Sequence, residues 1–277
     1  MTQKIGFVGK SGTGKSVIVS HISVALINMG YHVLQIGNDI SLESTRFLNM
    51  KEEMVPVLEE YREHYVINIE DYIKKGAHGV YLMELGNVTS GIGCQARGLE
   101  MAMELLYSQK VIEKLKLDYI LYDCTVDTPC AGCMLTFNKG IMDRCIVVTD
   151  ETKASLCVAN SILSSIQAEV DKAYVQLLAN KISSDYKLEL EDYSKMVNIP
   201  ILSMIDCFDE MQLCETKRET VFSCNKEGIA ADKFSKLAYR LIQESLPVYM
   251  TPFSRKDLFL WQQQWKDKGI AHVLNGN

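Results

Sequence analysis

The chain has 277 residues, enough for one large α/β domain or two small ones with a substantial core. Its net charge of −6 argues against a protein that coats nucleic acid, because such proteins carry a basic face. No apolar run approaches the ~20 residues of a membrane-spanning helix, and no signal peptide precedes the first expected strand. We therefore expect a cytoplasmic protein with neither a nucleic-acid nor a membrane partner.

Short apolar strands alternate with helical patterns along the chain. The predicted strands cover residues 5–8, 31–37, 80–83, 118–123, 144–149, 175–180 and 199–204. The predicted helices cover 17–29, 99–113, 154–170 and 232–244, another closes at 71–75, and a mildly amphipathic tail at 257–266 should dock as a helix. This order predicts the α/β class, with a mostly parallel sheet flanked by helices. Since no linker or repeat divides the chain, we expect a single domain over residues 1–277.

A phosphate-loop motif stands between the first strand and the first helix. It fits the template G-x-x-x-x-G-K-[ST] without a mismatch, and backbone N–H groups at such a helix start bind phosphate oxygens. Lys15 would neutralise the β- and γ-phosphates, and the Ser16 hydroxyl would ligate Mg²⁺. The predicted nucleotide-binding residues are Gly9, Lys10, Ser11, Gly12, Thr13, Gly14, Lys15 and Ser16.

Lys10 is a second lysine in this loop, and two interpretations of it stay open. It is either a solvated charge or, as in one branch of phosphate-loop proteins, a residue that reaches the partner's nucleotide across a dimer interface. Asp123 ends the fourth strand, as a Mg²⁺-linked carboxylate does, and Asp39 ends the second, as a general base or water-positioning group would. The competing interpretation makes both acids helix caps or solvated loop residues.

The nine cysteines divide into two kinds. Cys145 and Cys157 lie in apolar segments and are expected to be small buried residues, because a reducing cytosol disfavours disulfides. Cys94 and Cys130 instead follow strand ends close to the expected nucleotide site. Two cysteines are too few for a four-thiolate cluster, but two copies of the chain in a symmetric homodimer would supply four. The alternative is two unrelated free thiols.

Taken together, these motifs resemble the nitrogenase iron protein family, which includes the reductase subunits of protochlorophyllide reductase and of the coenzyme F430 pathway. The likeness runs nearly end to end. It comprises the phosphate loop with its second lysine, a first switch loop at 39–46 in which Glu43 replaces an aspartate, a cysteine-bearing segment at 84–98, and a second switch from Asp123 to Cys130.

The resemblance implies an ATP-dependent one-electron reductase. One [4Fe–4S] cluster would be shared by Cys94 and Cys130 of two identical subunits. MgATP would be bound and hydrolysed with Lys10, Lys15, Asp39 and Asp123 in catalytic roles, with Asn180 and Gln212 near the adenine. Ferredoxin or flavodoxin would donate electrons, and a nitrogenase or nitrogenase-like catalytic component would accept them after docking at Arg97.

Several positions depart from the family pattern. Ser41 replaces a common switch lysine, and Val126 replaces a glycine of the second switch. Cys133 replaces a bulky residue near the expected cluster. Asn138 and Ile141 stand where basic docking residues are frequent. These changes favour a nitrogenase-like reductase over a dedicated nitrogen-fixing one. A partition- or positioning-type dimeric ATPase would explain the phosphate loop but not the two cysteines, and an iron–sulfur cluster carrier is a third hypothesis.

Overall fold

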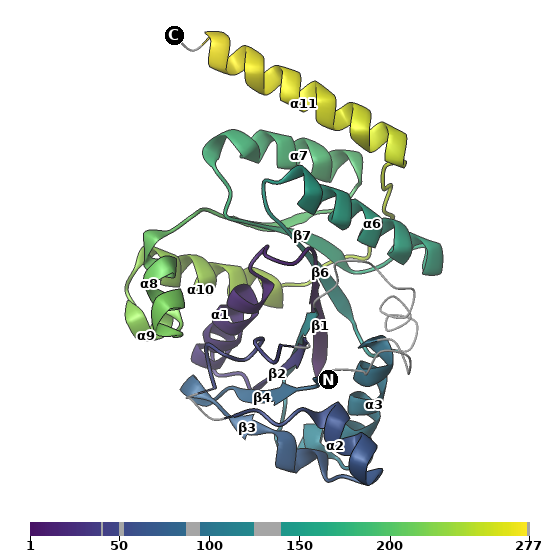
Figure 1. Ribbon diagram of the computed structural model, residues 1–277, viewed down its shortest axis with the longest axis vertical. Helices are drawn as coiled ribbons and strands as arrows, with labels where there is room; N and C mark the ends of the chain where they lie inside the picture. The colour runs from purple at the N-terminus through teal and green to yellow at the C-terminus, as the bar shows by residue number, and fades with distance from the viewer. Residues whose placement is uncertain (40, 50–52, 87–94, 125–139, 276–277) are drawn as a thin grey trace.

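The computed structural model describes residues 1–39, 41–49, 53–86, 95–124 and 140–275, with the backbone alone for 95–96 and 267–275 (Figure 1). Its centre is a sheet of eight strands in the order β3-β4-β2-β5-β1-β6-β7-β8, counted over these residues. Every neighbouring pair is parallel except β3 and β4. The strands are β1 Gln3–Val8, β2 Val33–Asn38, β3 Lys74–Lys75, β4 Tyr81–Glu84, β5 Tyr119–Cys124, β6 Arg144–Thr149, β7 Val175–Asn180 and β8 Ile201–Ile205.

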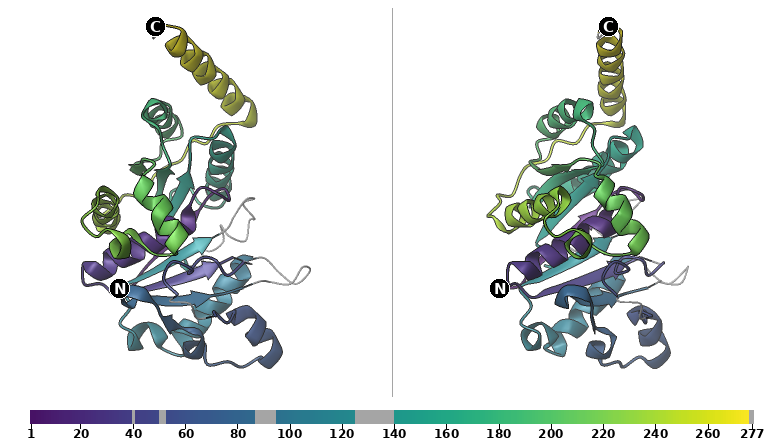
Figure 2. Two further views of the ribbon diagram at one scale, coloured as in Figure 1. Left: turned by 60° about the vertical axis from the view of Figure 1, so that its left-hand side comes forward. Right: turned by 90° about the vertical axis from the view of Figure 1, so that its left-hand side faces the viewer.

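Helices cover both faces of the sheet (Figure 2). On one face, α1, α8, α9 and α10 share a buried core with the sheet, and on the other face α2, α3, α4, α6 and α7 share a second core. The strands β2, β5 and β6 are buried along their whole length between these layers, as parallel strands require. The helices are α1 Lys15–Asn28, α2 Val57–His64, α3 Gln95–Ser108, α4 Val111–Lys114, α6 Lys153–Glu169, α7 Lys187–Met196, α8 Asp209–Lys217, α9 Val221–Cys224, α10 Ile229–Ile242 and α11 Arg255–Asn275.

The predicted α/β class with a mostly parallel sheet is therefore confirmed, and β6 and β7 have the predicted bounds. The prediction of a helix that ends over residues 71–75 is wrong. A 3-10 turn at Ile69–Tyr72 is followed there by β3, which pairs with β4. The Gln109 side chain fixes this turn, because it accepts from the Ile69 N–H (2.9 Å) and donates to the Ile67 carbonyl oxygen (2.8 Å).

The helix expected over 99–113 is in fact two helices. The chain breaks between α3 and α4 at Lys110, whose φ of 56° lies in the left-handed region. The expected burial of Cys145 is confirmed, but that of Cys157 is wrong. Cys157 is exposed on α6, where its Sγ lies 3.7 Å from the Gln262 amide nitrogen.

The C-terminal tail docks as a helix, as predicted. The indole N–H groups of Trp261 and Trp265 both donate to one carboxylate oxygen of Asp192 on α7, at 2.8 Å and 3.1 Å. Leu258 and Trp261 are buried in the second core. Across the described parts of the chain, none of the helices has the length and apolarity that a membrane span needs.

Candidate nucleotide site

The phosphate loop connects the carboxyl end of β1 to α1. The carboxyl ends of β2 and β5 lie at the same end of the sheet, which we call the nucleotide edge. In the strand register, Asp123 of β5 pairs with Phe7 of β1 on one side and with Gly37 of β2 on the other. Asp39 follows directly after β2. The fold thus brings the loop and the two predicted aspartates to one edge, because the carboxyl ends of parallel strands meet there.

The loop has the conformation of an anion cradle. Gly14 caps α1 with a φ of 88°, a left-handed conformation that glycine tolerates best. A Cβ at this position would lie 2.5 Å from the Asn180 amide nitrogen, so the loop and the end of β7 approach each other closely. Inside the loop, the buried Thr13 hydroxyl donates to the Lys10 carbonyl oxygen (2.8 Å). The N–H groups of the first turn of α1 therefore face outward around a fixed turn.

The two lysines of the loop lie differently. Lys15 is buried, and its Nζ donates to the carbonyl oxygens of Gly9 (2.9 Å) and Lys10 (3.0 Å). Phosphate oxygens entering the loop would offer this ammonium stronger, charged acceptors. Lys10 is half-buried, and its Nζ bonds only weakly to the Ser11 carbonyl oxygen (3.2 Å). Its ammonium lies at the exposed rim of the loop, where a second molecule could reach it.

Asp123 is buried, and neither of its carboxylate oxygens has a partner at hydrogen-bonding geometry within the described residues. Burial raises the pKa of this carboxyl, while the nearby hydroxyls of Ser16 and Ser44 and the Lys15 ammonium lower it. A buried carboxylate beside a serine hydroxyl suits a divalent cation that takes oxygen ligands. The residues present therefore fit Mg²⁺ bound with a nucleotide.

Asp39 begins the first switch loop and is half-buried. Its carboxylate accepts from the Ser41 hydroxyl (2.6 Å) and from the Ser41 N–H (3.3 Å), which closes a local turn. Farther along this loop, Glu43 forms an ion pair with Arg46. The Asp39 carboxylate is therefore hydrogen-bonded within its own loop.

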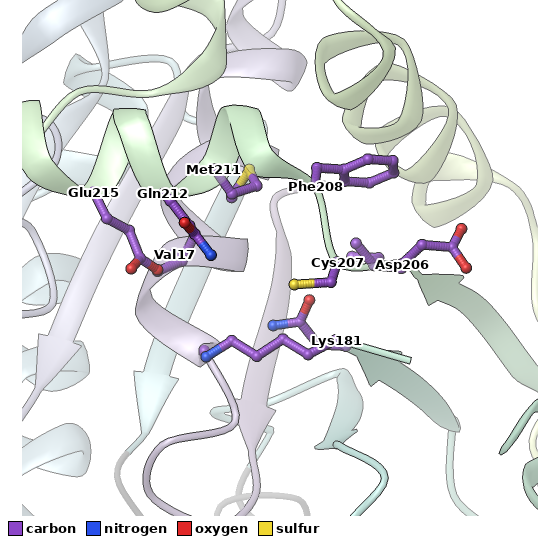
Figure 3. A pocket seen from close by; sticks show the side chains of 11 residues that line it. Val17, Lys181, Asp206, Cys207, Phe208, Met211, Gln212 and Glu215 are labelled. Atoms are coloured by element: carbon purple, nitrogen blue, oxygen red, sulfur yellow. The ribbon is translucent and has the colours of Figure 1, made fainter. Parts of the chain in front are cut away.

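A cavity of about 220 Å³ lies between the start of α1, the ends of β7 and β8, and α8 (Figure 3). Asn180 and Gln212, the two residues predicted to lie near the adenine, both line it, and so does Gly14 of the phosphate loop. Gln212 extends from α8 toward Lys181 on the opposite side. Val17, Phe208 and Met211 add apolar surface that suits the faces of a planar base.

Sequence reasoning missed Val17 and Met211 as site residues. The signal for Met211 was weak, because α8 is short and mostly polar. It also missed Glu84 as a site residue, although this acid, like Asp123, stands close to the carboxyl end of an apolar strand.

Arg97 is exposed on the first turn of α3, beside a groove of about 400 Å³ between α2 and α3. The groove is lined by Tyr61, Arg62, Glu100 and Glu104 in addition to Arg97. The predicted cluster ligands Cys94 and Cys130 lie outside the described residues, as do Val126, Cys133 and Asn138. Within the described ranges, no group of three or more His, Cys, Asp or Glu side chains could hold a metal.

The fold and the loop define a phosphate-loop ATPase fold of the MinD and ParA kind. The cell division protein MinD of Aquifex aeolicus superposes with a TM-score of 0.68 at 18% identity, covering 89% of this chain and 99% of MinD. A ParA family ATPase of Chlorobium tepidum gives the same TM-score at 16% identity, covering 88% of this chain and all of that one (100%). At these identities the likeness concerns the fold alone.

The model of the 4Fe–4S iron–sulfur cluster binding proteins of the NifH/frxC family matches residues 3–266, so the chain belongs to this family. It is 28% identical to nitrogenase iron protein 2 of Paenibacillus durus, over 95% of this chain and 91% of that protein. It is 29% identical to the light-independent protochlorophyllide reductase iron–sulfur ATP-binding protein of Rubrivivax gelatinosus, over 91% of this chain and 84% of that protein. The predicted family is thus confirmed.

Proposed function

We propose that this protein is an ATP-dependent one-electron reductase that works as a homodimer and passes electrons to a nitrogenase or nitrogenase-like catalytic component. The observation that carries this proposal is the family match over residues 3–266, which spans both Cys94 and Cys130. Relatives named as a nitrogenase iron protein and as a protochlorophyllide reductase ATP-binding subunit support the same activity.

The nucleotide half of the function rests on the phosphate loop and its neighbours. Lys15 and the N–H groups at the start of α1 would bind the β- and γ-phosphates, and Ser16 with Asp123 would hold Mg²⁺. Lys10, at the exposed rim, would act on the γ-phosphate bound by the partner subunit. The adenine would occupy the cavity lined by Asn180, Gln212 and Phe208, which adjoins Gly14 of the loop.

The redox half rests on Cys94 and Cys130, whose thiolates from two subunits would hold one [4Fe–4S] cluster. The cluster supplies the one-electron chemistry, and the chain supplies its ligands and its exposure. Cys94 stands ten residues after the end of β4, and Cys130 stands seven residues after Asp123. Both ligands therefore follow strands that end at the nucleotide edge, so nucleotide binding can alter the environment of the cluster.

Ferredoxin or flavodoxin would reduce the cluster, and the catalytic component would dock near Arg97 at the start of α3. The departures at Ser41, Val126, Asn138 and Ile141 favour a nitrogenase-like acceptor over the nitrogen-fixing one. A partition- or positioning-type ATPase needs the phosphate loop but has no use for Cys94 and Cys130. An iron–sulfur carrier would hand its cluster to an apo-acceptor without ATP-driven electron transfer.

The proposal is tested by chelating iron from the anaerobically purified protein with 2,2′-bipyridyl. We expect MgATP to accelerate chelation in the wild type, because the nucleotide changes cluster exposure. In Lys15→Gln the iron should be retained and the acceleration should be lost. If the rate of iron release from the wild type were the same with and without MgATP, this would contradict the coupling between nucleotide and cluster and would favour an iron–sulfur carrier.

A further inference from the structure

Glu84 is a buried acid at the nucleotide edge that the proposed function does not use. It is the last residue of β4 and is fully buried, with none of its surface exposed (0%). In the strand register it pairs with Gly37 of β2, and Gly37 pairs on its other side with Asp123 of β5. Glu84 and Asp123 therefore stand at the same level on the two strands that flank β2.

One oxygen of the Glu84 carboxyl is hydrogen-bonded to the first switch loop. Oε1 accepts a hydrogen bond from the Thr45 N–H at 2.8 Å, whereas Oε2 has no partner within the described residues. The side chain lies directly over Gly37, since a Cβ there would stand 1.8 Å from Oε2. Burial raises the pKa of Glu84 to about 7, against the opposing effect of the Thr45 hydrogen bond. Burying a carboxyl costs free energy, and buried acids with raised pKa values concentrate at functional sites.

Consecutive residues of the switch loop contact the two acids. The Thr45 N–H bonds to Glu84, and the Ser44 hydroxyl lies close enough to Asp123 to lower its pKa. Both Ser44 and Thr45 are fully buried. The switch loop is thus held at Thr45 by a hydrogen bond to Glu84, and the preceding residue, Ser44, lies beside Asp123.

The chain continues from each acid toward one predicted cluster ligand, Cys94 after Glu84 and Cys130 after Asp123. After Glu84, the Leu85 N–H bonds to the Gly37 carbonyl oxygen (2.8 Å), and the Leu85 carbonyl oxygen accepts from the Leu58 N–H (3.0 Å). Gly86 then lies against Pro56, and Gly98, on α3, lies against Leu58. The segment that carries Cys94 therefore leaves and returns at the first turn of α2.

We propose that Glu84 is a positioning residue that couples the first switch loop to the segment carrying Cys94, in parallel with the coupling of Asp123 to the segment carrying Cys130. The inference rests on the proposed function for its purpose, because that function needs nucleotide state to reach both ligands. A movement of Thr45 would displace the carboxyl and, through the covalent chain, Leu85 and Gly86. Each of the two ligands would then have its own connection to the switch loop.

Amide hydrogen exchange by mass spectrometry tests this coupling without relying on the cluster. In the full-length wild type, we expect MgATP to change exchange in residues 9–16, 41–49 and 85–98. In Glu84→Ala the change at 9–16 should persist, while the change at 85–98 should be lost, because no carboxyl then joins Thr45 to the end of β4. Glu84→Gln keeps an oxygen that can accept from the Thr45 N–H, so it should respond like the wild type.

Two further variants keep the result decisive. Gly37→Ala keeps the Glu84 side chain but places a methyl group 1.8 Å from its Oε2 and 2.6 Å from the Ser44 Cβ, so it should displace both the carboxyl and the switch loop and reproduce the loss seen in Glu84→Ala. Glu189→Ala removes a partly buried acid of α7 outside the site and should leave the nucleotide response intact. A wild-type response at 85–98 in Glu84→Ala, or no response there in the wild type, would overturn the inference. Iron-free protein that still shows the coupling would contradict only the proposed reductase function.

Discussion

The side-chain amide of Asn180 donates a hydrogen bond to the backbone carbonyl oxygen of Thr13 at 2.8 Å, across 167 positions of the sequence. This contact joins the end of β7 to the phosphate loop, and it is buried. The conformation of the loop therefore depends on a strand far away in the chain. It also places the Asn180 carboxamide on the wall of the cavity next to Gly14.

Replacing Asn180 with alanine should weaken nucleotide binding. The Thr13 carbonyl oxygen loses its donor and the cavity loses a polar wall, so we expect the Kd for MgATP to rise about tenfold, the effect of one lost buried hydrogen bond. Isothermal titration calorimetry measures this change. Asn198→Ala is the matched control, because Asn198 makes a similar bond to the Tyr249 carbonyl oxygen (2.6 Å) on an exposed surface. Equal affinities in Asn180→Ala and wild type would exclude a role for Asn180 in the site.

Lys15→Gln should abolish ATP hydrolysis while leaving the fold intact. The ammonium is buried against the loop carbonyl oxygens, and glutamine can still donate to them but cannot neutralise phosphate charge. We expect the hydrolysis rate to fall about a hundredfold or more, as when a preorganised transition-state donor is lost. A phosphate-release assay measures the rate, and thermal unfolding checks the fold. A variant that hydrolyses ATP at the wild-type rate would refute the assignment of Lys15.

Cys94→Ser and Cys130→Ser should each lose their iron, because a serine hydroxyl is a poor substitute for a thiolate ligand. Cys157→Ser provides the control, since Cys157 is an exposed cysteine on α6 and should be replaceable without loss. Iron analysis of the anaerobically purified variants, beside the wild type, measures the outcome. Full iron content in either Cys94→Ser or Cys130→Ser would remove that residue from the ligand set.

His21 should make the protein sensitive to acid. Its ring is buried in α1, bonded to the Val17 carbonyl oxygen (2.6 Å) and the Val221 N–H (3.0 Å), and stacked on Phe234. Burial lowers its pKa from 6.5 to about 4, so the folded state disfavours the charged ring. The neutral ring therefore makes its full contribution to the free energy of unfolding above pH 6.5, and this contribution is lost as the pH falls toward 4. The loss amounts to about 3 kcal/mol of unfolding free energy.

Urea unfolding at several pH values measures this loss, with His21→Gln as the variant that cannot titrate. The raised pKa of Glu84 acts in the opposite direction, since its contribution is present below pH 4.5 and is lost as the pH rises through about 7. The difference between wild type and His21→Gln cancels the Glu84 contribution and isolates that of His21. A constant difference from pH 7 to pH 4 would contradict a neutral His21 in the fold.

The sequence was sufficient to predict the sheet and the phosphate loop, because buried parallel strands are continuous apolar runs and the loop has a fixed spacing. It failed where tertiary contacts determine the local structure. The turn at Ile69–Tyr72 depends on Gln109, and the break between α3 and α4 depends on the backbone of Lys110. Neither effect follows from hydrophobic periodicity.

Short polar helices were missed for a related reason. The helices α2, α7 and α8 have eight to ten residues and mostly polar sequences, so their stability comes from the core that they cover. Since α8 forms one wall of the cavity, the apolar contribution of Met211 was missed with it. Glu84 was overlooked as a site residue because only the strand register places it beside Gly37 and one strand away from Asp123.

The most direct test of the reductase function is low-temperature EPR with iron analysis on the anaerobically purified, dithionite-reduced protein, with and without MgATP. We predict about four irons per dimer, as one shared [4Fe–4S] cluster requires, and a reduced-cluster signal that changes when MgATP is added. Iron-free protein that resists reconstitution with iron and sulfide, yet still hydrolyses ATP, would contradict the account and indicate a positioning-type ATPase.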